Sequence, residues 1–419
     1  MGQGRGVGHG RIGPRLAVLA AAAFVYVTSE TFPIALLPQM ADGLGVGEAA
    51  VGRLVTVYAA VVAVTAVPLV ALARRAPRRA LVTGMVAALC VSNLVVAVAP
   101  GYPTVLAARL VGALAHGVFW SVLAPVAAGL VGPERAGRAT ATVFLGNSLA
   151  LVAGTPLVTG LGVALGWRSA AAILAVVAGL CAVLIRAALP ALPAPDTGAP
   201  VVSAVRTAVR DRPLLGLCGT TVLLVTGHFA AYTYVTLFVR RDVGVDGGAL
   251  ALVLFGYGAA GVVGTVVVGR ALDASPRATA VAATAVVAAS LLGLGLLGVG
   301  LLGVGPVGPA LPAVGLVAVL AWGGAFTSVP ACLQTAVLRV APGSGELESA
   351  VYVVAFQVGI AAGALVGGVF VSAGAFPALP FAAAAAVAVG LLAVLVGRRA
   401  FPSARVPSTA APADEAPVG

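Results

Sequence analysis

Apolar stretches long enough to cross a lipid bilayer follow one another along almost the whole chain of 419 residues. A membrane-spanning helix needs about 20 mostly apolar residues. Cutting the sequence at Arg, Pro, Gly and acidic clusters predicts twelve such segments, and their approximate ranges are 16–38, 50–73, 80–99, 104–130, 139–163, 168–189, 213–239, 248–269, 278–301, 309–338, 349–373 and 378–397. The predicted fold class is therefore an all-α membrane protein with twelve transmembrane helices.

Charged residues are too few for a protein that folds in water. They make up 9% of the chain, whereas soluble domains contain roughly 25%. A soluble enzyme, a disordered protein and a disulfide-stapled secreted module are excluded on this ground. The four Cys residues lie inside apolar stretches without paired spacing, so we expect neither a disulfide framework nor a metal site. We expect no cofactor, and a Walker-type ATP site is excluded because the chain has no Lys.

The Arg residues, which give a net charge of +11, lie in the short gaps between apolar segments. Nineteen of the 24 fall on one side of the predicted membrane and four on the other, while Arg109 lies inside a segment. By the positive-inside rule, both termini are predicted to be cytoplasmic. The Arg residues do not form one basic patch, so nucleic acid is not expected as a partner. The use of Arg without Lys, with abundant Ala, Gly and Val, is typical of a GC-rich bacterial genome, and we expect a bacterial plasma membrane protein.

The longest internal connection, 190–212, is rich in Pro and divides the segments into six and six. We expect it to be a cytoplasmic linker between an N-terminal bundle over 16–189 and a C-terminal bundle over 213–397. Cytoplasmic tails are predicted over 1–15 and 398–419, and the second is predicted to be disordered because it is rich in Pro, Ala and Ser.

The fourth segment of each half carries a similar short motif. Residues 115–120 read AHGVFW and residues 321–326 read AWGGAF, so both have Ala, a ring, Gly, two further residues and a large aromatic side chain. Together with the division into six and six, the motif favours a duplicated transporter.

Further motifs carry a family resemblance over nearly the whole chain. They are 29–38 (SETFPIALLP), Gly154-Thr155-Pro156 followed by Gly160, Gly166-Trp167-Arg168, and 269–273 (GRALD) followed by Pro276-Arg277. With them the chain resembles the major facilitator superfamily, in particular its drug:proton antiporter branch near the bacterial sugar- and arabinose-efflux permeases. The resemblance implies two six-helix bundles, a small-molecule substrate, protons as a second partner, and a monomer in the lipid bilayer.

The resemblance also assigns conformational roles to particular residues. These are Gly154, Thr155 and Pro156 in the fifth segment, and Gly269, Asp273 and Arg277 in the hinge motif of the second half. The first-half copy of the hinge motif, 74–79 (RRAPRR), lacks the expected Asp. An ion pair that is normal to the family is therefore expected to be absent there. The usual Gln-Gly one turn after Arg109 is also replaced, by Gly112-Ala113.

Three residues are candidates for proton coupling. Glu30 is the one acidic residue well inside a predicted segment, where a charge costs about 2.5–3.5 kcal/mol. It is predicted to carry a proton or to bind a cationic substrate, and the alternative is a helix-end carboxylate that reaches water. The resemblance links Arg109 to proton coupling, and a clamp on backbone carbonyls is the alternative. His116 lies two turns further along the same face and is either a proton relay or a buried neutral side chain.

Candidates for substrate contacts are aromatic and amide side chains within the segments, because transporter sites lie near the midplane of the membrane. They are Tyr58, Trp120, Asn147, His228, Tyr232, Trp322, Phe326, Gln334 and Gln357. Trp322, Phe326 and Gln334 are predicted to share one helical stripe, and His228 shares a helix face with Tyr232. For each candidate, packing between helices is the alternative role.

The leading interpretation is a proton-coupled secondary transporter that exports small organic molecules by alternating access. The segments contain few Asn, Gln and acidic residues, which favours amphiphilic substrates. The alternatives are a facilitator or importer of a sugar- or nucleoside-like solute and, from a different class, a non-transporting membrane receptor or a membrane-embedded enzyme. The segments carry no cluster of acid–base, metal-binding or nucleophilic residues that supports an enzyme.

Overall fold

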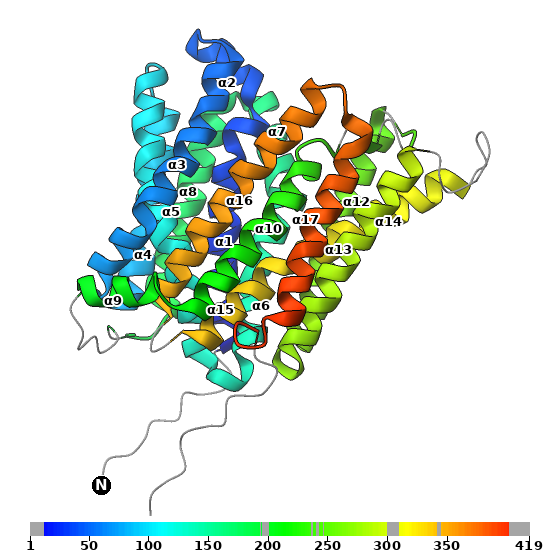
Figure 1. The fold of residues 1–419 in the computed structure, drawn as a ribbon. Coiled ribbons are helices and arrows are strands. Elements are labelled where there is room, and N and C mark those ends of the chain that lie inside the picture. Colours follow the sequence, from blue (N-terminus) through cyan, green and yellow to red (C-terminus); the bar gives the residue numbers. More distant parts are fainter. Residues whose placement is uncertain are drawn as a thin grey trace, which may run out of the picture.

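The computed structural model describes residues 12–192, 194, 201–235, 238–239, 243–245, 247–299, 310–341 and 345–401. These residues form a bundle of helices, and no strand occurs among them (Figure 1). The helices of the first half are α1 (Ile12–Ala35), α2 (Leu37–Leu44), α3 (Glu48–Ala73), α4 (Arg78–Ala97), α5 (Tyr102–Val131), α6 (Ala136–Leu149), α7 (Thr155–Leu165) and α8 (Trp167–Ala188). After α9 (Val201–Ala208), the second half contains α10 (Arg212–Tyr232), α12 (Gly247–Ala274), α13 (Pro276–Gly298), α14 (Ala310–Phe326), α15 (Val329–Val340), α16 (Glu346–Ser372) and α17 (Leu379–Val396).

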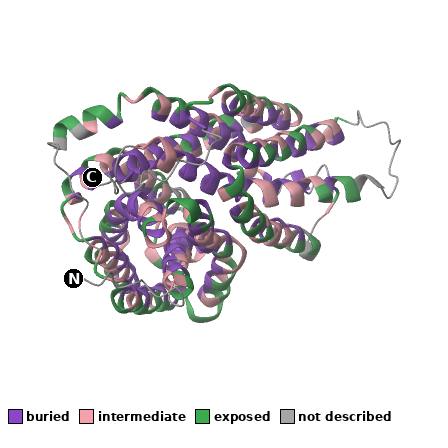
Figure 2. Ribbon diagram, turned by 90° about the horizontal axis from the view of Figure 1, so that it is seen from below, coloured by how far each residue is buried: buried purple, intermediate pink, exposed green. Residues whose placement is uncertain are grey.

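The prediction of twelve membrane-spanning segments is confirmed. Twelve helical stretches of the described chain are long and apolar enough to cross a membrane. Many large apolar side chains point outward, and Val64 and Leu72 are each 75% exposed. Exposed residues gather on the outer surfaces of the helices, and buried residues lie on the faces that the helices turn toward one another (Figure 2). An outer surface of this kind is suited to lipid and not to water.

The seventh predicted segment, 213–239, is interrupted by a turn at 233–234. Three further interruptions of predicted segments lie near prolines. The first segment is broken at Leu36 between α1 and α2. The fifth consists of α6, a π-helical turn over Ala150–Gly154 (η3), and α7. The tenth is broken between α14 and α15, just before Pro330. Each of these three breaks lies near a proline, whose ring and missing N–H disrupt the helical hydrogen-bond ladder.

The helices pack within two halves and across the boundary between them. In the first half α4 packs on α5 and α8, and α1 packs on α6 and α8; in the second half α10 packs on α16 and α17, and α12 packs on α14. Between the halves α3 contacts α16, and α6 contacts both α12 and α15. We call the face at which α1 begins and α17 ends the chain-end face (lower side of Figure 1).

Small residues allow some of these helices to approach closely. A Cβ atom at Gly146 of α6 would collide with the carbonyl of Ala20 on α1, and a Cβ atom at Gly264 of α12 would collide with the carbonyl of Gly324 on α14. Glycine is therefore required at both positions for the observed packing.

The connection between the halves is partly helical. The predicted Pro-rich linker contains α9, which contacts both α3 and α16 at the chain-end face. The gap expected between the ninth and tenth segments, 302–308, and the tail from 402 onward lie outside the described residues. The division into domains stays a prediction.

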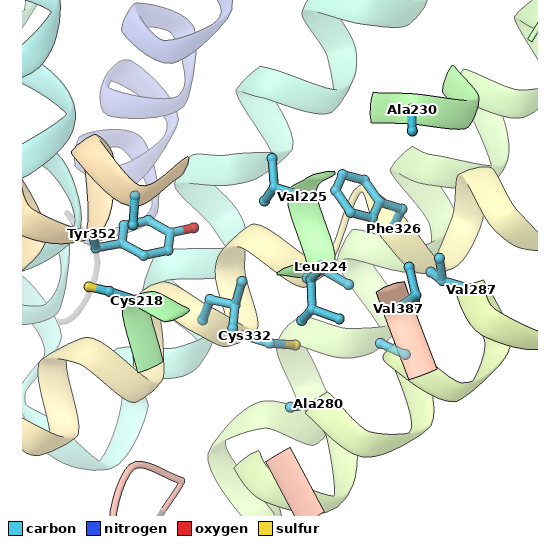
Figure 3. Packing of buried hydrophobic residues seen from close by; sticks show 14 of the residues in the cluster. Cys218, Leu224, Val225, Ala230, Ala280, Val287, Phe326, Cys332, Tyr352 and Val387 are labelled. Carbon is cyan, nitrogen blue, oxygen red and sulfur yellow. The ribbon is translucent and has the colours of Figure 1, made fainter. Parts of the chain in front are cut away.

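The largest apolar core contains residues of both halves. Its second-half part joins α10, α15 and α16 through Cys218, Leu224, Cys332 and Tyr352 (Figure 3). On the first-half side Val62 and other residues of α3 belong to the same core. The two halves are thus held together by apolar packing as well as by polar contacts.

Candidate functional site

A proline in α1 leaves one buried carbonyl without its helical donor. In an α-helix the carbonyl of Ser29 would accept from the N–H of residue 33, but Pro33 has no N–H. Arg109 of α5 supplies the missing donor. Its Nη1 donates to the Ser29 carbonyl at 2.6 Å, and its Nη2 donates to the Glu30 carbonyl at 3.2 Å. The guanidinium, 3% exposed, thus binds the α1 backbone, as the clamp alternative requires.

Glu30 lies in the last two turns of α1, beside Arg109. Its side chain is half-buried. No ion pair joins it to Arg109 within 4 Å in the described part of the chain. The arginine is thus held close to the acid by the backbone of α1 and not by the carboxylate.

Aromatic and polar side chains fix this arrangement from two further helices. The guanidinium carbon of Arg109 lies 4.5 Å from the centre of the Tyr58 ring on α3, in cation–π geometry. The hydroxyl of Ser29 donates to Oδ1 of Asn93 on α4 at 2.9 Å, and Nδ2 of Asn93 donates to the carbonyl of Leu89 at 3.0 Å. Sequence reasoning missed Asn93, because a single amide within an apolar segment carries no motif.

His116 belongs to a cluster of rings in the first half. Its ring lies edge-on to Tyr58 at 5.3 Å and to Tyr26 at 5.9 Å, between ring centres. Trp120, which is half-buried, continues the cluster toward Phe144 of α6. Within the described residues, Nδ1 of His116 is buried and has no hydrogen-bond partner.

The second half contains a matching cluster. Trp322 of α14 lies edge-on to Tyr257 of α12 at 5.5 Å and to His228 of α10 at 5.5 Å. Its indole N–H donates to Nδ1 of His228 at 3.0 Å. Tyr232 and Phe326 stack on the His228 ring. Four of the predicted substrate residues therefore lie together, namely His228, Tyr232, Trp322 and Phe326.

The two clusters occupy equivalent places in their halves. The motif residues His116 and Trp322 each meet a tyrosine of the second span of their half, Tyr58 and Tyr257, at nearly the same distance and angle. The repeat seen in the sequence therefore corresponds to a repeat in space.

Two of the other predicted substrate residues, Gln334 and Gln357, do not join these clusters. The break between α14 and α15 separates Gln334 from Trp322 and Phe326, so the predicted common stripe is wrong. Gln334 instead donates to the hydroxyl of Ser349 on α16 at 2.7 Å. In the described chain, Nε2 of Gln357 is buried without a partner, and Asn147 on α6 is half-buried.

The Gly154-Thr155-Pro156 motif lies against α1 next to Glu30. The hydroxyl oxygens of Thr155 and Thr31 are 3.1 Å apart, and a Cβ atom at Gly154 would collide with the hydroxyl of Thr28. The π-helical turn over Ala150–Gly154 ends at the first residue of the motif, and such turns are frequent at functional sites. A movement of α7 would therefore reach α1 at Thr31, adjacent to Glu30.

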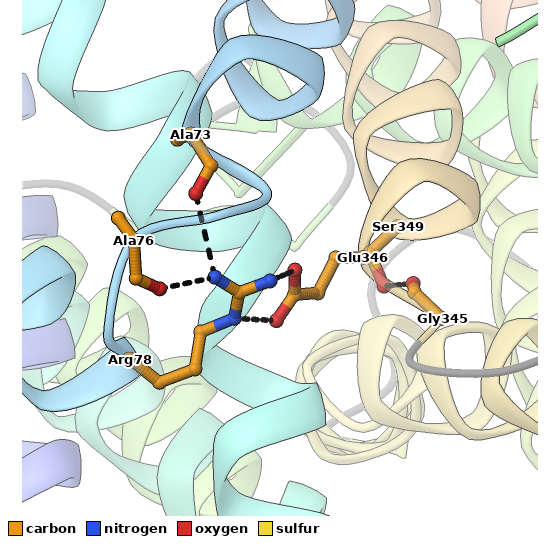
Figure 4. A network of polar contacts seen from close by, with 6 residues as sticks. All are labelled: Ala73, Ala76, Arg78, Gly345, Glu346 and Ser349. Atoms are coloured by element: carbon orange, nitrogen blue, oxygen red, sulfur yellow. Dashed lines mark hydrogen bonds and ion pairs between the residues drawn. The ribbon is translucent and has the colours of Figure 1, made fainter. Parts of the chain in front are cut away.

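Two polar contacts, which we call latches, join the halves at the chain-end face. In the Arg78 latch, the guanidinium of Arg78 on α4 forms a two-pronged ion pair with Glu346 at the start of α16 (Figure 4). Nη1 of Arg78 also donates to the carbonyls of Ala76 at 2.6 Å and Ala73 at 3.4 Å. In the Asp273 latch, Oδ1 of Asp273 accepts from the backbone N–H of Arg138 at the start of α6, at 3.1 Å.

The expectation that the first-half hinge motif lacks an ion pair is wrong. Position 74 is Arg instead of Asp, but Arg78 finds its acid on the other half, at Glu346. Both side chains are almost completely buried. The signal in the sequence is the pair Glu346 and Glu348 at the start of a span in a chain with few acidic residues.

The other hinge residues also contact neighbouring helices. Arg277 donates to the carbonyls of Val394 and Leu395 at the end of α17, and a Cβ atom at Gly269 would collide with Ala141 on α6. Gly269 thus allows α12 to approach α6 where Asp273 binds it.

A family model described as Major Facilitator Superfamily matches residues 19–346. The chain belongs to this superfamily. It is 38% identical over 358 residues to a chloramphenicol efflux pump of Mycobacterium tuberculosis, a match that covers 85% of this chain and 86% of the relative. It is 30% identical over 357 residues to a probable sugar efflux transporter of Helicobacter pylori, covering 85% of this chain and 88% of the relative.

Solved structures of major facilitator proteins share the fold. The E. coli fucose:proton symporter aligns with a TM-score of 0.71 at 16% identity, covering 91% of this chain and 98% of the symporter. A bacterial homologue of the iron transporter ferroportin, in an outward-facing state, aligns with a TM-score of 0.73 at 12% identity and with the same coverage. The predicted fold of two six-helix bundles is thereby confirmed, and the chain is a multi-pass membrane transporter of this superfamily.

Proposed function

We propose that this major facilitator protein is a proton-coupled exporter of small organic molecules in the bacterial plasma membrane. It acts as a monomer by alternating access, with both termini in the cytoplasm. The observation that carries the proposal is Glu30, a half-buried carboxyl group within a membrane-spanning helix, next to an arginine that does not neutralise it by a direct ion pair. The cost of a charge at this depth favours a group that exchanges its proton.

Glu30 and the motif of α7 provide a physical route for coupling. When Glu30 binds a proton, the charge beside Arg109 changes by one unit. The electrostatic attraction between Arg109 and the carboxyl group on α1 then becomes weaker. The contact between Thr31 and Thr155 links α1 to the π-helical turn in the fifth span. The proton and the substrate must each bind one conformation of the transporter better than the other, because a ligand with equal affinity for both does not shift the equilibrium between them.

We assign aromatic, uncharged or amphiphilic molecules as the substrate class. The half-buried Trp120 and Tyr232 belong to the two ring clusters, and pockets for small organic molecules are mostly apolar with a few polar groups. The similarity to a chloramphenicol efflux pump supports this class. The sugar efflux relatives at 30% identity favour a second candidate, sugar export, with Asn147 and Gln357 as polar contacts.

The test measures proton movement in inside-out membrane vesicles with a pH-sensitive dye. Chloramphenicol, an amphiphilic cation, a sugar and a nucleoside are added to vesicles that contain wild type, Glu30→Gln or Asp42→Asn. We expect one compound class to release protons with wild type and with Asp42→Asn, whose carboxyl is exposed on α2, but not with Glu30→Gln. Equal proton release by wild type and Glu30→Gln would overturn the role of Glu30. Uptake without proton movement would favour a facilitator.

A further inference from the structure

Pro33 creates the site at which Arg109 binds α1. Ser29 is almost completely buried, and a buried carbonyl without a donor is destabilising. The bond of 2.6 Å from Arg109 satisfies this carbonyl. An alanine at position 33 would supply an N–H four residues after Ser29 and would remove the need for arginine.

Arg109 has two partners within reach that compete for it. One is the backbone of α1, which holds Nη1 and Nη2 in this structure. The other is the carboxyl group of Glu30, on the same turn of α1. The Nε–H of Arg109 is buried and unpaired in the described part of the chain, so the guanidinium retains a free donor for a second acceptor.

The surroundings allow only a small movement between these partners. The Tyr58 ring covers one face of the guanidinium. The bond between Ser29 and Asn93 fixes the α1 turn to α4, and Thr31 contacts Thr155 of α7. Exchange of partners therefore requires rotation of the Arg109 side chain and not displacement of a helix.

We propose that Pro33 is a positioning residue for proton exchange at Glu30. The carbonyl that Pro33 leaves free binds Arg109 while Glu30 is protonated, so that the buried guanidinium keeps a partner when the carboxyl group is neutral. When the proton leaves, Arg109 turns toward the carboxylate. Pro33 thereby sets the balance between the two states of Glu30. This inference rests on the proposed role of Glu30 as the proton-exchanging group.

Few other titratable groups face the pair. Tyr58 of α3 and His116 of α5 interact with it, and η3 and α7, which also contact α1, contain no titratable residue. The facing side chain of α4 is Asn93, which does not titrate. On α1 itself, Arg15 donates to the carbonyl of Ala188 and Tyr26 to the carbonyl of Met85. The remaining ionisable groups with described side chains on neighbouring helices lie in the first or last turns of their helices, in the exposed part of α2 or against other partners, and are Asp42, Arg53, Arg78, Arg79, Cys90, Tyr102, Arg138, Arg168, Cys181 and Arg186.

The test is the pH dependence of carbodiimide labelling of Glu30 in the purified full-length protein, because the reagent reacts with protonated buried carboxyl groups. Glu30→Gln defines the background from other acids. In Pro33→Ala, Arg109 is free to pair with the carboxylate, and we expect half-maximal labelling to move to lower pH by about one unit, equivalent to about 1.4 kcal/mol. The matched control is Pro68→Ala, which restores an N–H within α3 away from Arg109, and its labelling should match that of wild type.

The outcomes separate this inference from the proposed function. Labelling of Pro33→Ala with the same pH midpoint as wild type overturns the role of Pro33, whatever transport shows. A shifted midpoint together with unchanged proton movement in Glu30→Gln vesicles overturns proton coupling but leaves the positioning role intact. If Pro33→Ala does not fold, Asn93→Ala releases the Ser29 turn and should also shift the midpoint; an unchanged midpoint there contradicts the inference.

Discussion

Hydrogen bonds at single atoms distinguish the two buried histidines. Nδ1 of His228 accepts the indole N–H of Trp322, and a doubly protonated imidazole has no acceptor to offer. His228 is therefore neutral while this bond persists, whereas Nδ1 of His116 has no partner in the described structure. In our proposal proton exchange takes place at Glu30 in the first half, and His228 stabilises the ring cluster of the second half.

The bond between Trp322 and His228 should contribute measurably to stability. In Trp322→Phe the ring remains but Nδ1 of His228 loses its donor, and an unpaired buried acceptor costs about 1–3 kcal/mol. We expect a lower thermal unfolding temperature for the purified protein. Trp120→Phe is the matched control, because it is the same truncation at the equivalent cluster, where the indole lies partly exposed. Equal unfolding temperatures for the two variants would contradict the contribution of this bond.

At the scale of helices, contacts between the termini of α4 and α16 and of α6 and α12 join the two halves at the chain-end face. The Arg78 latch joins the first residues of α4 and α16, and the Asp273 latch joins the end of α12 to the start of α6. Breaking a buried ion pair by removing one partner costs about 3–5 kcal/mol, because the other charge stays buried and unpaired. Movement of the halves away from each other exposes these groups to water and relieves that cost. The latches thus hold the two halves together at this face.

Loss of the Arg78 latch should favour opening of the chain-end face. In Glu346→Gln we expect Cys332, buried on α15 near the boundary between the halves, to react with a maleimide about tenfold faster, equivalent to about 1.4 kcal/mol. The other three cysteines are replaced by alanine so that labelling reports on Cys332. The double variant Arg78→Glu with Glu346→Arg should recover part of the protection, since the carbonyl bonds of Arg78 are lost. Unchanged labelling in Glu346→Gln would show that the latch does not hold the face closed.

At the scale of the molecule, the two halves share a ring cluster but differ in charge. The first half places Glu30 and Arg109 next to its cluster, and the second half surrounds His228 with Tyr232, Trp322 and Phe326. We infer a division of roles, in which the first half exchanges protons and the second half contributes apolar contacts to the substrate.

This division predicts separable effects on transport. Tyr232→Ala should raise the substrate concentration for half-maximal transport two- to tenfold, since an aromatic contact contributes about 0.5–1.5 kcal/mol, without a change in protons moved per substrate. Transport and proton release are measured in the same vesicles. Tyr234→Ala, which removes a tyrosine that contacts Gly367 of α16, is the control and should leave both values unchanged. A changed proton ratio in Tyr232→Ala would refute the division.

The sequence was sufficient for features that depend on local composition. The length and polarity of each apolar stretch are local, so the twelve spans and their order could be predicted. The partners Arg78 and Glu346 are 268 positions apart, and Trp322 and His228 are 94 apart, so their contacts depend on how the halves pack. The break between α14 and α15, which moved Gln334 away from Trp322, likewise depends on a single proline in its packing environment.

The two latches differ in how many side chains they require. Asp273 binds the backbone N–H of position 138, which every residue except proline supplies. Only the side chain at position 273 must therefore be retained to keep this contact. The Arg78 latch needs two matched side chains on different halves. In descendants of this chain, positions 78 and 346 are therefore expected to change together, whereas position 273 is expected to stay acidic on its own.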